Sequence, residues 1–489
     1  MKLNKIFKDA PAIEIASLHN DSRNKMANGM FFCLDGILTN GHKFIDKAIE
    51  NGAICIVHSE EIKKHSPDIA YIQVVSVNDT LNQVVAKFYH YPSESLCVFG
   101  VTGTNGKSTV TNIIKDIYDH FAPCGYIGTI SISYNNVHRS PDLTTPDALM
   151  LNNVLADMVA DNVKAVALEV SSHGLEQKRV DSIDFDIVAF TNFSYDHIDF
   201  HGTMENYFNA KKRLFSLVKE SGVSIINHDE ECYDALSLES RARIISYGIQ
   251  KESDYQALNL TLDKTGSSFD LLYENKTYPV KTNLIAMYNI YNLLCAIACV
   301  HQSGIPLDNI LPYTAHLSQV EGRLEIIDEG QPFNVIVDFA HTPDGLRKIY
   351  EYAKMITEDN GDIISVFGSA GRRDKAKRKV FGEIASQYCN YIILTEDDPR
   401  DESAKLIAEE IRSGIHENIR TIFIEERYDA IRQAVESANK NDTILILGKG
   451  DETFMYRENG RMPWLGDNVA VIDCIKKYYL NNFDIDKNE

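Results

Sequence analysis

Residues 96–121 read LCVFGVTGTNGKSTVTNIIKDIYDHF, and this stretch decides the fold of the chain around it. An apolar run at 96–101 leads into a glycine-containing segment at 102–109, and apolar residues then recur at helical spacing across 110–121. This order predicts a buried strand, a phosphate-binding loop and an amphipathic helix. The stretch therefore indicates a site for a nucleoside triphosphate.

Each polar residue of this loop has a predicted role. Backbone N–H groups and the helix N-terminus bind phosphate, Lys107 reaches the outer phosphates, and Ser108 or Thr109 holds Mg²⁺. The pattern departs from G-x-x-x-x-G-K-[ST], because Val101 stands five residues before Gly106, where that pattern has its first glycine. A glycine turn without a ligand would not need a lysine and two hydroxyls next to it.

Composition limits the class of protein. With 489 residues, of which 44% are hydrophobic, the chain should form about three domains with ordinary cores. Its 49 Lys+Arg and 70 Asp+Glu give a net charge of −21, which disfavours a general affinity for nucleic acid or anionic membrane. Nine scattered cysteines without a C-x-x-C pair indicate reduced thiols and a cytoplasmic location. No apolar run is long enough to span a membrane.

Alternating apolar and helical patterns predict an α/β fold in three domains, at 1–95, 96–325 and 326–489. The first is a small α/β domain, and the last is a doubly wound, Rossmann-like domain. Between them lies the phosphate-loop domain, where the patterns at 244–283 indicate a β-rich insertion or an extension of its sheet. In the third domain, strands are predicted at 334–339, 363–367, 391–395, 421–425 and 443–447.

Polar residues follow most of these strands, at the sheet edge where ligands bind in open α/β folds. In the central domain, a strand at 163–170 delivers Glu169, which we interpret as a Mg²⁺ ligand. The His/Asp cluster at 196–201 lacks the cysteine or third spaced histidine that zinc would require. In the third domain, the strands lead into the loops DFAHTPDG, GSAGRRDKAKR, TEDDPRDE and GKGDE.

From DSR at 21–23 to GKGDE at 448–452, these stretches together resemble the Mur ligase family over nearly the whole chain. The resemblance implies an N-terminal domain for a uridine nucleotide, a central ATPase and a C-terminal domain for an incoming amino acid. It also implies an ATP- and Mg²⁺-dependent ligase of peptidoglycan precursor synthesis. Such an enzyme joins a diamino acid to UDP-MurNAc-L-Ala-D-Glu through an acyl phosphate. We expect a monomer that binds no nucleic acid or membrane.

The resemblance also assigns residues around the nucleotide. It implies that ATP is bound by Gly103, Thr104, Asn105, Gly106, Lys107, Ser108, Thr109, Asn292, Arg323 and His341. Mg²⁺ would be held by Ser108, Glu169 and a carbamylated Lys211, since carbamylation turns an amine into an anionic oxygen ligand. The expected catalytic groups are Lys107, Glu169, His197 and Lys211. Without the resemblance, Lys211 reads as a lysine on the surface of a helix.

Substrate contacts follow from the same resemblance. Ser22 would contact the UDP-sugar, although 21–23 alone reads as a solvated turn. The sugar–dipeptide substrate would be bound by Thr144, Thr145, Ser171, Gln177 and Arg179, and the amino acid by Arg373, Asp397, Asp398, Pro399, Arg400, Gly448 and Glu452. An arginine suits a carboxylate, and a glutamate in a pocket suits an ammonium group.

Two departures from the family pattern bear on the amino acid. Asp398 replaces the asparagine of D-N-P-R, and Arg372 replaces an aspartate. An added carboxylate beside the pocket favours the distal ammonium of L-lysine, whereas Arg400 suits the distal carboxylate of meso-diaminopimelate. We predict L-lysine, with meso-diaminopimelate as the alternative.

Three other functions are compatible with parts of the sequence. A folylpolyglutamate synthase-like ligase shares the ATPase core but lacks the domain that precedes the phosphate loop here. A non-catalytic nucleotide-binding regulatory protein would not need Lys107, Glu169, Lys211, Arg373 and Glu452 together. A small-molecule kinase would have no use for the polar set of the third domain.

Overall fold

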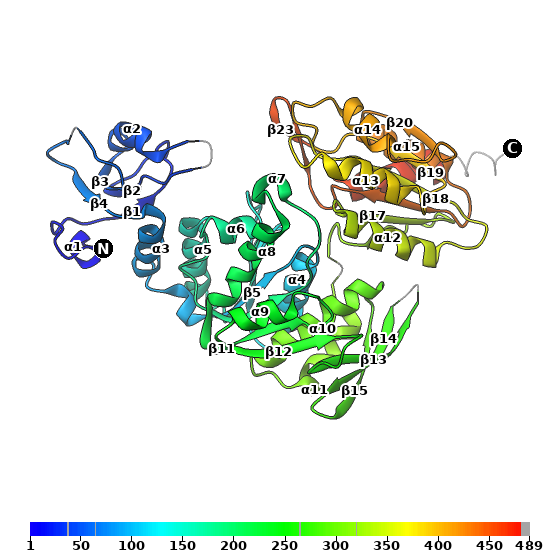
Figure 1. Ribbon diagram of the computed structural model, residues 1–489, viewed down its shortest axis with the longest axis horizontal. Helices are drawn as coiled ribbons and strands as arrows, with labels where there is room; N and C mark the ends of the chain where they lie inside the picture. Colours follow the sequence, from blue (N-terminus) through cyan, green and yellow to red (C-terminus); the bar gives the residue numbers. More distant parts are fainter. Residues whose placement is uncertain (37–38, 64, 264–265, 319, 481–489) are drawn as a thin grey trace.

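The computed structural model describes residues 1–489 except 37–38, 64, 264–265, 319 and 481–489. Three large sheets, of four, eleven and six strands, follow one another along the chain, and a two-stranded hairpin comes last. Figure 1 shows them as three bodies, coloured blue, cyan to green, and yellow to red. Within the described residues, no helix has the length and apolarity needed to cross a membrane.

The N-terminal body has a parallel sheet of order β1-β2-β3-β4. Its elements are α1 (Leu3–Ile6), β1 (Ser17–His19), β2 (Gly29–Phe32), η1 (Gly41–Phe44), α2 (Ile45–Glu50), β3 (Ala53–His58), β4 (Ala70–Gln73), α3 (Val77–Phe88) and η2 (Pro92–Ser95). Strand β1 is only three residues long, which is too short to show a periodic pattern in the sequence.

The central body is built on a sheet of order β15-β14-β13-β12-β11-β10-β5-β9-β6-β7-β8. Its elements are β5 (Cys97–Thr102), α4 (Lys107–Tyr118), β6 (Cys124–Ile127), β7 (Ile132–Tyr134), β8 (Val137–Arg139), α5 (Ala148–Ala160), β9 (Ala165–Glu169), α6 (Ser172–Glu176), β10 (Phe185–Phe190), α7 (Ile198–His201), α8 (Met204–Lys212), η3 (Arg213–Ser216), β11 (Val218–Asn227), α9 (Tyr233–Glu239), β12 (Arg243–Gly248), β13 (Tyr255–Leu262), β14 (Ser267–Tyr273), β15 (Lys276–Thr282), α10 (Met287–Gln302), α11 (Leu307–Ile310) and η4 (Leu311–His316).

Strands β6 and β9 to β13 run parallel with β5, while β7, β8, β14 and β15 add antiparallel edges. The segment 244–283 is therefore an extension of the central sheet. Both faces of the sheet are covered, because β5 points Phe99 and Val101 into a core shared with α4 and α10, and Val98 into one shared with α5.

The C-terminal body has a sheet of order β16-β17-β21-β18-β19-β20, parallel except for β16. Its elements are β16 (Glu325–Ile326), β17 (Asn334–Asp338), α12 (Pro343–Ile356), β18 (Ile363–Phe367), α13 (Ala376–Ala385), β19 (Tyr391–Leu394), α14 (Ala404–Arg412), β20 (Arg420–Phe423), α15 (Arg427–Ser437), β21 (Thr443–Leu447), β22 (Phe454–Arg457), β23 (Gly460–Pro463), α16 (Asp467–Cys474) and η5 (Ile475–Leu480). Helices α12 to α14 share a core with one face of this sheet, and α15 and α16 with the other. The α/β prediction is confirmed, including the doubly wound third sheet.

Candidate active site

The loop between β5 and α4 is shaped by two glycines with positive φ. Gly103 has φ +148° and Gly106 has φ +86°, a region that residues with a Cβ rarely adopt. A Cβ at Gly103 would lie 1.9 Å from Thr191 Oγ1, and one at Gly106 would lie 2.4 Å from Asn292 Oδ1. The loop is thus packed between β10 and α10, and α4 begins directly after it at Lys107.

Lys107 lies across the loop rather than in an ion pair. Its Nζ donates to the carbonyl oxygens of Gly103 at 3.1 Å and Thr104 at 2.9 Å. Within the described part of the chain, no carboxylate lies in ion-pair distance of Lys107. Burial lowers the pKa of this amine, so an anion at the loop would stabilise its charged form.

Glu169, at the end of β9, is fully buried and held by hydrogen-bond donors. Ser108 Oγ donates to Oε2 at 2.9 Å, Tyr126 OH donates to Oε1 at 2.5 Å, and the backbone N–H of Thr129 donates to Oε1 at 3.0 Å. The carboxylate is oriented beside the loop, and among the described residues no cationic side chain forms an ion pair with it. Ser108 and Glu169 together offer the oxygen atoms that Mg²⁺ prefers.

Lys211, on α8, is 1% exposed, so its reading as a surface lysine is wrong. Its Nζ donates to the carbonyl oxygen of Gly103 at 2.7 Å and lies 4.4 Å from the centre of the Tyr207 ring. Burial holds the pKa of the amine well below its usual value. Lys211 therefore reaches the back of the phosphate loop from another helix.

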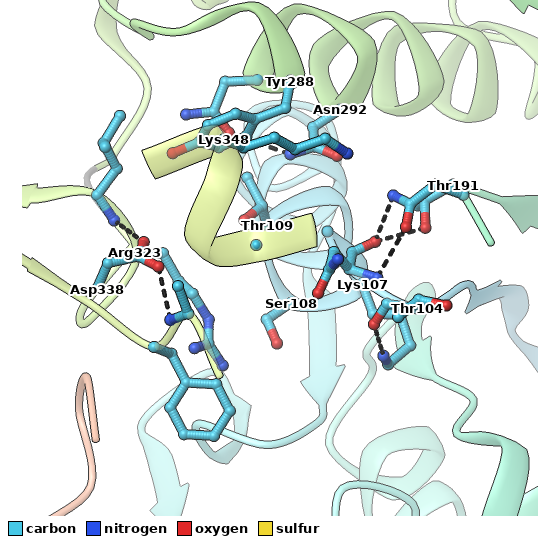
Figure 2. Close-up of a pocket in the computed structure, with 18 of the residues that line it drawn as sticks. Thr104, Lys107, Ser108, Thr109, Thr191, Tyr288, Asn292, Arg323, Asp338 and Lys348 are labelled. Atoms are coloured by element: carbon cyan, nitrogen blue, oxygen red, sulfur yellow. Dashed lines mark hydrogen bonds between the residues drawn. The ribbon is translucent and has the colours of Figure 1, made fainter. Parts of the chain in front are cut away.

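A cavity of about 950 Å³ opens beside the loop and is lined by the central and C-terminal bodies. Of the residues proposed from the sequence, it is lined by Thr104, Asn105, Gly106, Lys107, Ser108, Thr109, Thr144, Glu169, Ser171, Arg179, His197, Asn292, Arg323, His341, Arg373 and Glu452. Figure 2 shows Arg323 facing Ser108 across the cavity, with Tyr288, Asn292 and Lys348 grouped at one end. The volume suits a nucleotide-sized ligand.

Two histidines flank Asp196 where the central and C-terminal bodies meet. His197 Nε2 lies 3.3 Å from Asp196 Oδ2, and His341 Nε2 lies 3.8 Å from the same oxygen. Burial lowers the pKa of His197 to about 2 and that of His341 to about 4. Both rings are therefore neutral near pH 7 and can orient groups by hydrogen bonding.

The residues assigned to the sugar–dipeptide substrate form one network around Thr145. Thr145 Oγ1 donates to Ser171 Oγ at 3.1 Å, and Arg179 Nη1 donates to the carbonyl oxygen of Thr145 at 2.8 Å. Gln177 Oε1 accepts from Arg179 Nη2 at 2.6 Å. Thr144 Oγ1 lies 3.0 Å from Thr129 Oγ1, which links this network to the hydrogen bonds around Glu169.

In the C-terminal body, two arginines face different directions. Arg373 Nη1 lies 3.7 Å from Asp199 Oδ2 of the central body, and Arg373 lines the cavity. Arg400 Nη1 donates to the carbonyl oxygen of Gly371 at 2.5 Å, and its guanidinium carbon lies 5.4 Å from the centre of the Tyr456 ring. The substituted Arg372 pairs with Asp401 at the exposed surface.

Lys449 is a residue that the sequence reasoning missed. It is fully buried, and its Nζ forms ion pairs with Asp398 Oδ1 at 2.8 Å and with Glu452 Oε2. Asp397 approaches the same loop, since a Cβ at Gly448 would lie 2.5 Å from Asp397 Oδ2. The GKGDE loop contains this lysine, and its position between two glycines after a strand was the available signal.

The remaining assigned residues lie outside the cavity lining. They are Ser22, Gly103, Thr145, Gln177, Lys211, Asp397, Asp398, Pro399, Arg400 and Gly448. Thr145, Gln177 and Lys211 contact residues of the lining or the loop. Ser22 is in the N-terminal body, where its carbonyl oxygen accepts from Asn51, while Asp21 and Arg23 form an exposed ion pair beside it. Tyr126 and Thr129, which orient Glu169, were also missed.

The chain is similar to known proteins along most of its length. Residues 101–300 match the Mur ligase middle domain, and residues 322–450 match the Mur ligase, glutamate ligase domain. The chain is 37% identical over 478 residues to UDP-N-acetylmuramoyl-L-alanyl-D-glutamate--2,6-diaminopimelate ligase of Chlamydia felis, covering 97% of each chain. It is 35% identical over 474 residues to UDP-N-acetylmuramyl-tripeptide synthetase 2 of Oceanobacillus iheyensis, covering 96% of this chain and 95% of the relative.

A solved structure of a UDP-N-acetylmuramoyl-L-alanyl-D-glutamate--2,6-diaminopimelate ligase is also similar. It superposes with a TM-score of 0.69 at 28% identity, covering 97% of this chain and 99% of that one. These matches extend over the N-terminal body, a domain that a folylpolyglutamate synthase-like ligase would lack. The chain belongs to the Mur ligase family, a family of ATP-dependent ligases.

Proposed function

We propose that this ligase adds meso-diaminopimelate to UDP-MurNAc-L-Ala-D-Glu, at the expense of ATP, in peptidoglycan precursor synthesis. One observation carries the proposal: a single cavity is lined by the phosphate loop of the central body and by Arg373 and Glu452 of the C-terminal body. A kinase would need only the first set. The names of two similar proteins, one of them a solved structure, support diaminopimelate.

The three bodies divide the substrates between them in this proposal. Residues 1–95, with Ser22, bind the uridine nucleotide, and residues 96–325 bind ATP. Residues 326–489, of which 481–489 lie outside the described part, bind the amino acid. The nucleotide site comprises the loop residues Gly103 to Thr109 with Asn292, Arg323 and His341. We also propose a cytoplasmic monomer.

Mg²⁺ fits the residues beside the loop. Glu169 is a buried carboxylate that accepts hydrogen bonds from neutral donors, and Ser108 Oγ is 2.9 Å away, so a cation there would meet an oriented negative charge. Bound Mg²⁺ would neutralise charge on the transferring phosphoryl group. Lys211 is a candidate third ligand after carbamylation, because its amine is buried and pairs with a carbonyl oxygen rather than a carboxylate.

The reaction has two steps. The D-Glu carboxylate of the substrate attacks the γ-phosphorus of ATP, which forms an acyl phosphate and releases ADP. The amine of the amino acid then attacks the acyl carbon, which forms the amide, releases phosphate and frees a proton. Lys107 and the loop N–H groups stabilise phosphate charge. His197, neutral and beside the loop, orients the reacting groups together with Glu169.

Thr144, Thr145, Ser171, Gln177 and Arg179 orient the dipeptide end of the substrate. Their hydrogen-bond network adjoins the Glu169 site through Thr129 and Thr144, which supports a reacting carboxylate placed near the phosphate loop. The amino acid is bound by Arg373, Asp397, Asp398, Pro399, Arg400, Gly448 and Glu452.

The choice of meso-diaminopimelate over L-lysine depends on Asp398. As a free carboxylate it would favour a distal ammonium group. Its Oδ1 already accepts from Lys449 Nζ at 2.8 Å and from the backbone N–H of Tyr456 at 2.9 Å, so its charge is balanced within the protein. Arg400 is then the residue nearest in sequence that can bind a distal carboxylate. L-Lysine remains the alternative amino acid.

Phosphate release tests the proposal. Purified protein is given ATP, Mg²⁺ and UDP-MurNAc-L-Ala-D-Glu, with meso-diaminopimelate, L-lysine or no amino acid. We expect release that requires both the nucleotide sugar and meso-diaminopimelate. Release with L-lysine alone would overturn the choice of amino acid, and release with folate and glutamate would favour the folylpolyglutamate synthase-like reading. Silence with every amino acid would favour the regulatory reading.

A further inference from the structure

Lys449 has an unusual environment for a lysine. It follows β21 in the loop 448–452, is fully buried, and contacts two carboxylates that come from different segments. Asp398 follows β19, and Glu452 lies three residues further along the loop of Lys449. The Nζ is also 4.9 Å from the centre of the Phe454 ring. Carboxylate partners of this kind stabilise the charged form of a buried lysine.

Three carboxyl groups gather around this one ammonium group. Asp397, Asp398 and Glu452 all interact electrostatically with Lys449 and with one another, and Asp397 also interacts with Arg427 and Asp467. Asp397 and Asp398 are both buried. Buried carboxylates at close range cannot all remain ionised without a cation. Arg427 is already paired with Asp467 at 2.6 Å. Lys449 is thus the cation that contacts Asp398 and Glu452 directly.

We propose that Lys449 is a positioning residue that sets amino-acid specificity, by neutralising Asp398 and holding Glu452 as an oriented carboxylate. The inference rests on the proposed ligase function and goes beyond it, since it assigns the choice of amino acid to a residue that need not touch the substrate. With Lys449 in place, the pocket accepts an amino acid whose far end carries a carboxylate. Without it, two unpaired carboxylates would repel that end and favour a bare ammonium group.

The pH dependence should reveal this role. Burial raises the pKa of Glu452 to about 7, and the neighbouring Lys449 opposes that rise, while Asp398 and Asp397 add to it. If ionised Glu452 binds the amino group, kcat/KM for the amino acid rises as pH increases through about 7. Removing Lys449 moves this acidic limb to higher pH, and removing the Asp398 charge moves it to lower pH.

The test compares wild-type protein with Lys449→Met, Asp398→Asn and the double variant, each as the full chain. Methionine keeps the length and apolar stem of lysine without its charge, and Asp398→Asn is the matched control of opposite sign. The readouts are kcat/KM for meso-diaminopimelate and L-lysine across pH, KM for ATP, and thermal unfolding.

We expect Lys449→Met to lower the diaminopimelate-to-lysine ratio of kcat/KM by about tenfold, the effect of one uncompensated charge at close range. Asp398→Asn should raise the ratio, and the double variant should recover most of the loss. KM for ATP should stay within about twofold, because Lys449 pairs with Asp398 and Glu452, neither of which belongs to the phosphate loop. Equal losses for both amino acids with an unmoved acidic limb would overturn the proposal.

If Lys449→Met does not fold, the Asp398→Asn variant alone tests the role of Lys449. An unchanged diaminopimelate-to-lysine ratio of kcat/KM and an unchanged pH profile in that variant would contradict the inference. The wild-type assay distinguishes a failure of the proposed function from a failure of the role proposed for Lys449. Wild type that is inactive with both amino acids refutes the proposed function. Wild type that is active while the variants leave the ratio unchanged refutes only the role of Lys449.

Discussion

The phosphate loop and the proposed amino-acid pocket each contain a lysine, and the amines of these two lysines have opposite partners. Lys107 Nζ donates to the carbonyl oxygens of Gly103 and Thr104, whereas Lys449 Nζ pairs with the carboxylates of Asp398 and Glu452. Burial lowers the pKa of Lys107, while the pKa of Lys449 is raised because its carboxylate partners outweigh burial.

The charge of Lys107 can therefore be neutralised by an anionic ligand, whereas the charge of Lys449 is neutralised by carboxylates of the protein itself. An amine held only by carbonyl oxygens gains most when a phosphate arrives, because no carboxylate has to be displaced. An amine between two carboxylates holds those groups in place. The first arrangement suits catalysis on an anion, and the second suits the shaping of a pocket.

The largest effect is expected at Lys107, whose amine contacts only carbonyl oxygens among the described residues. Lys107→Ala should lower amino-acid-dependent phosphate release by at least about 10³-fold, because the phosphoryl group loses a preorganised cation. Thermal unfolding should change little, since Lys107 has no ion pair to lose among the described residues. Normal turnover in this variant would remove the phosphate loop from the mechanism.

A smaller effect is expected at the carboxylate beside the loop. Glu169→Gln should raise the Mg²⁺ concentration for half-maximal activity by about 100-fold, and Tyr126→Phe, which removes one donor to Glu169, by about 10-fold. Calorimetric titration of ADP with and without Mg²⁺ provides a readout independent of turnover. If both variants bind Mg²⁺–ADP as wild type does, Glu169 is not a metal ligand.

Contact between the phosphate loop and the C-terminal body can be measured as a coupling energy. Asn105 Nδ2, in the phosphate loop, donates to Asp344 Oδ2 of α12 at 3.2 Å. A double-mutant cycle of Asn105→Ala and Asp344→Ala on kcat/KM for the amino acid should give a coupling of about 1 kcal/mol. Lys348→Ala removes an ion-pair partner of Asp344 and serves as the control. Strictly additive losses would show that the loop and α12 act independently.

A further effect concerns the stability of the unliganded protein. Burial raises the pKa of Glu452 to about 7 from its usual value near 4.5, so the folded state retains a proton that the unfolded state has lost. Stability should therefore fall as pH rises between these values. Glu452→Gln should flatten this dependence in thermal unfolding scans. An unchanged slope would mean that Glu452 is ionised throughout the range.

The order of strands and helices was predictable because each element carries its own periodic pattern. In the C-terminal sheet, the expected strands at 363–367 and 443–447 coincide with β18 and β21. The phosphate loop was predictable for a similar reason, since its glycines, lysine and hydroxyls are adjacent in sequence. For residues 244–283, the sequence could not distinguish a β-rich insertion from an extension of the central sheet. Strand periodicity does not reveal which sheet a strand joins.

Burial and pairing of charges were not predictable. Lys211 lies in the polar run MENYFNAKK, and only the packing of α8 behind the loop buries it. Asp398 and Lys449 are 51 residues apart in sequence and meet only because β19 and β21 end at the same sheet edge. The lysine prediction depended on Asp398 being free, a property set by that distant partner.

The most direct test of the account is a competition between the two amino acids. Wild-type protein is incubated with ATP, Mg²⁺, UDP-MurNAc-L-Ala-D-Glu and equal concentrations of meso-diaminopimelate and L-lysine, and the product is identified by mass spectrometry. If Lys449 neutralises the charge of Asp398, the diaminopimelate-containing product should dominate. A product that contains L-lysine would contradict the account, because it would show that Asp398 acts as a free carboxylate despite its pairing with Lys449.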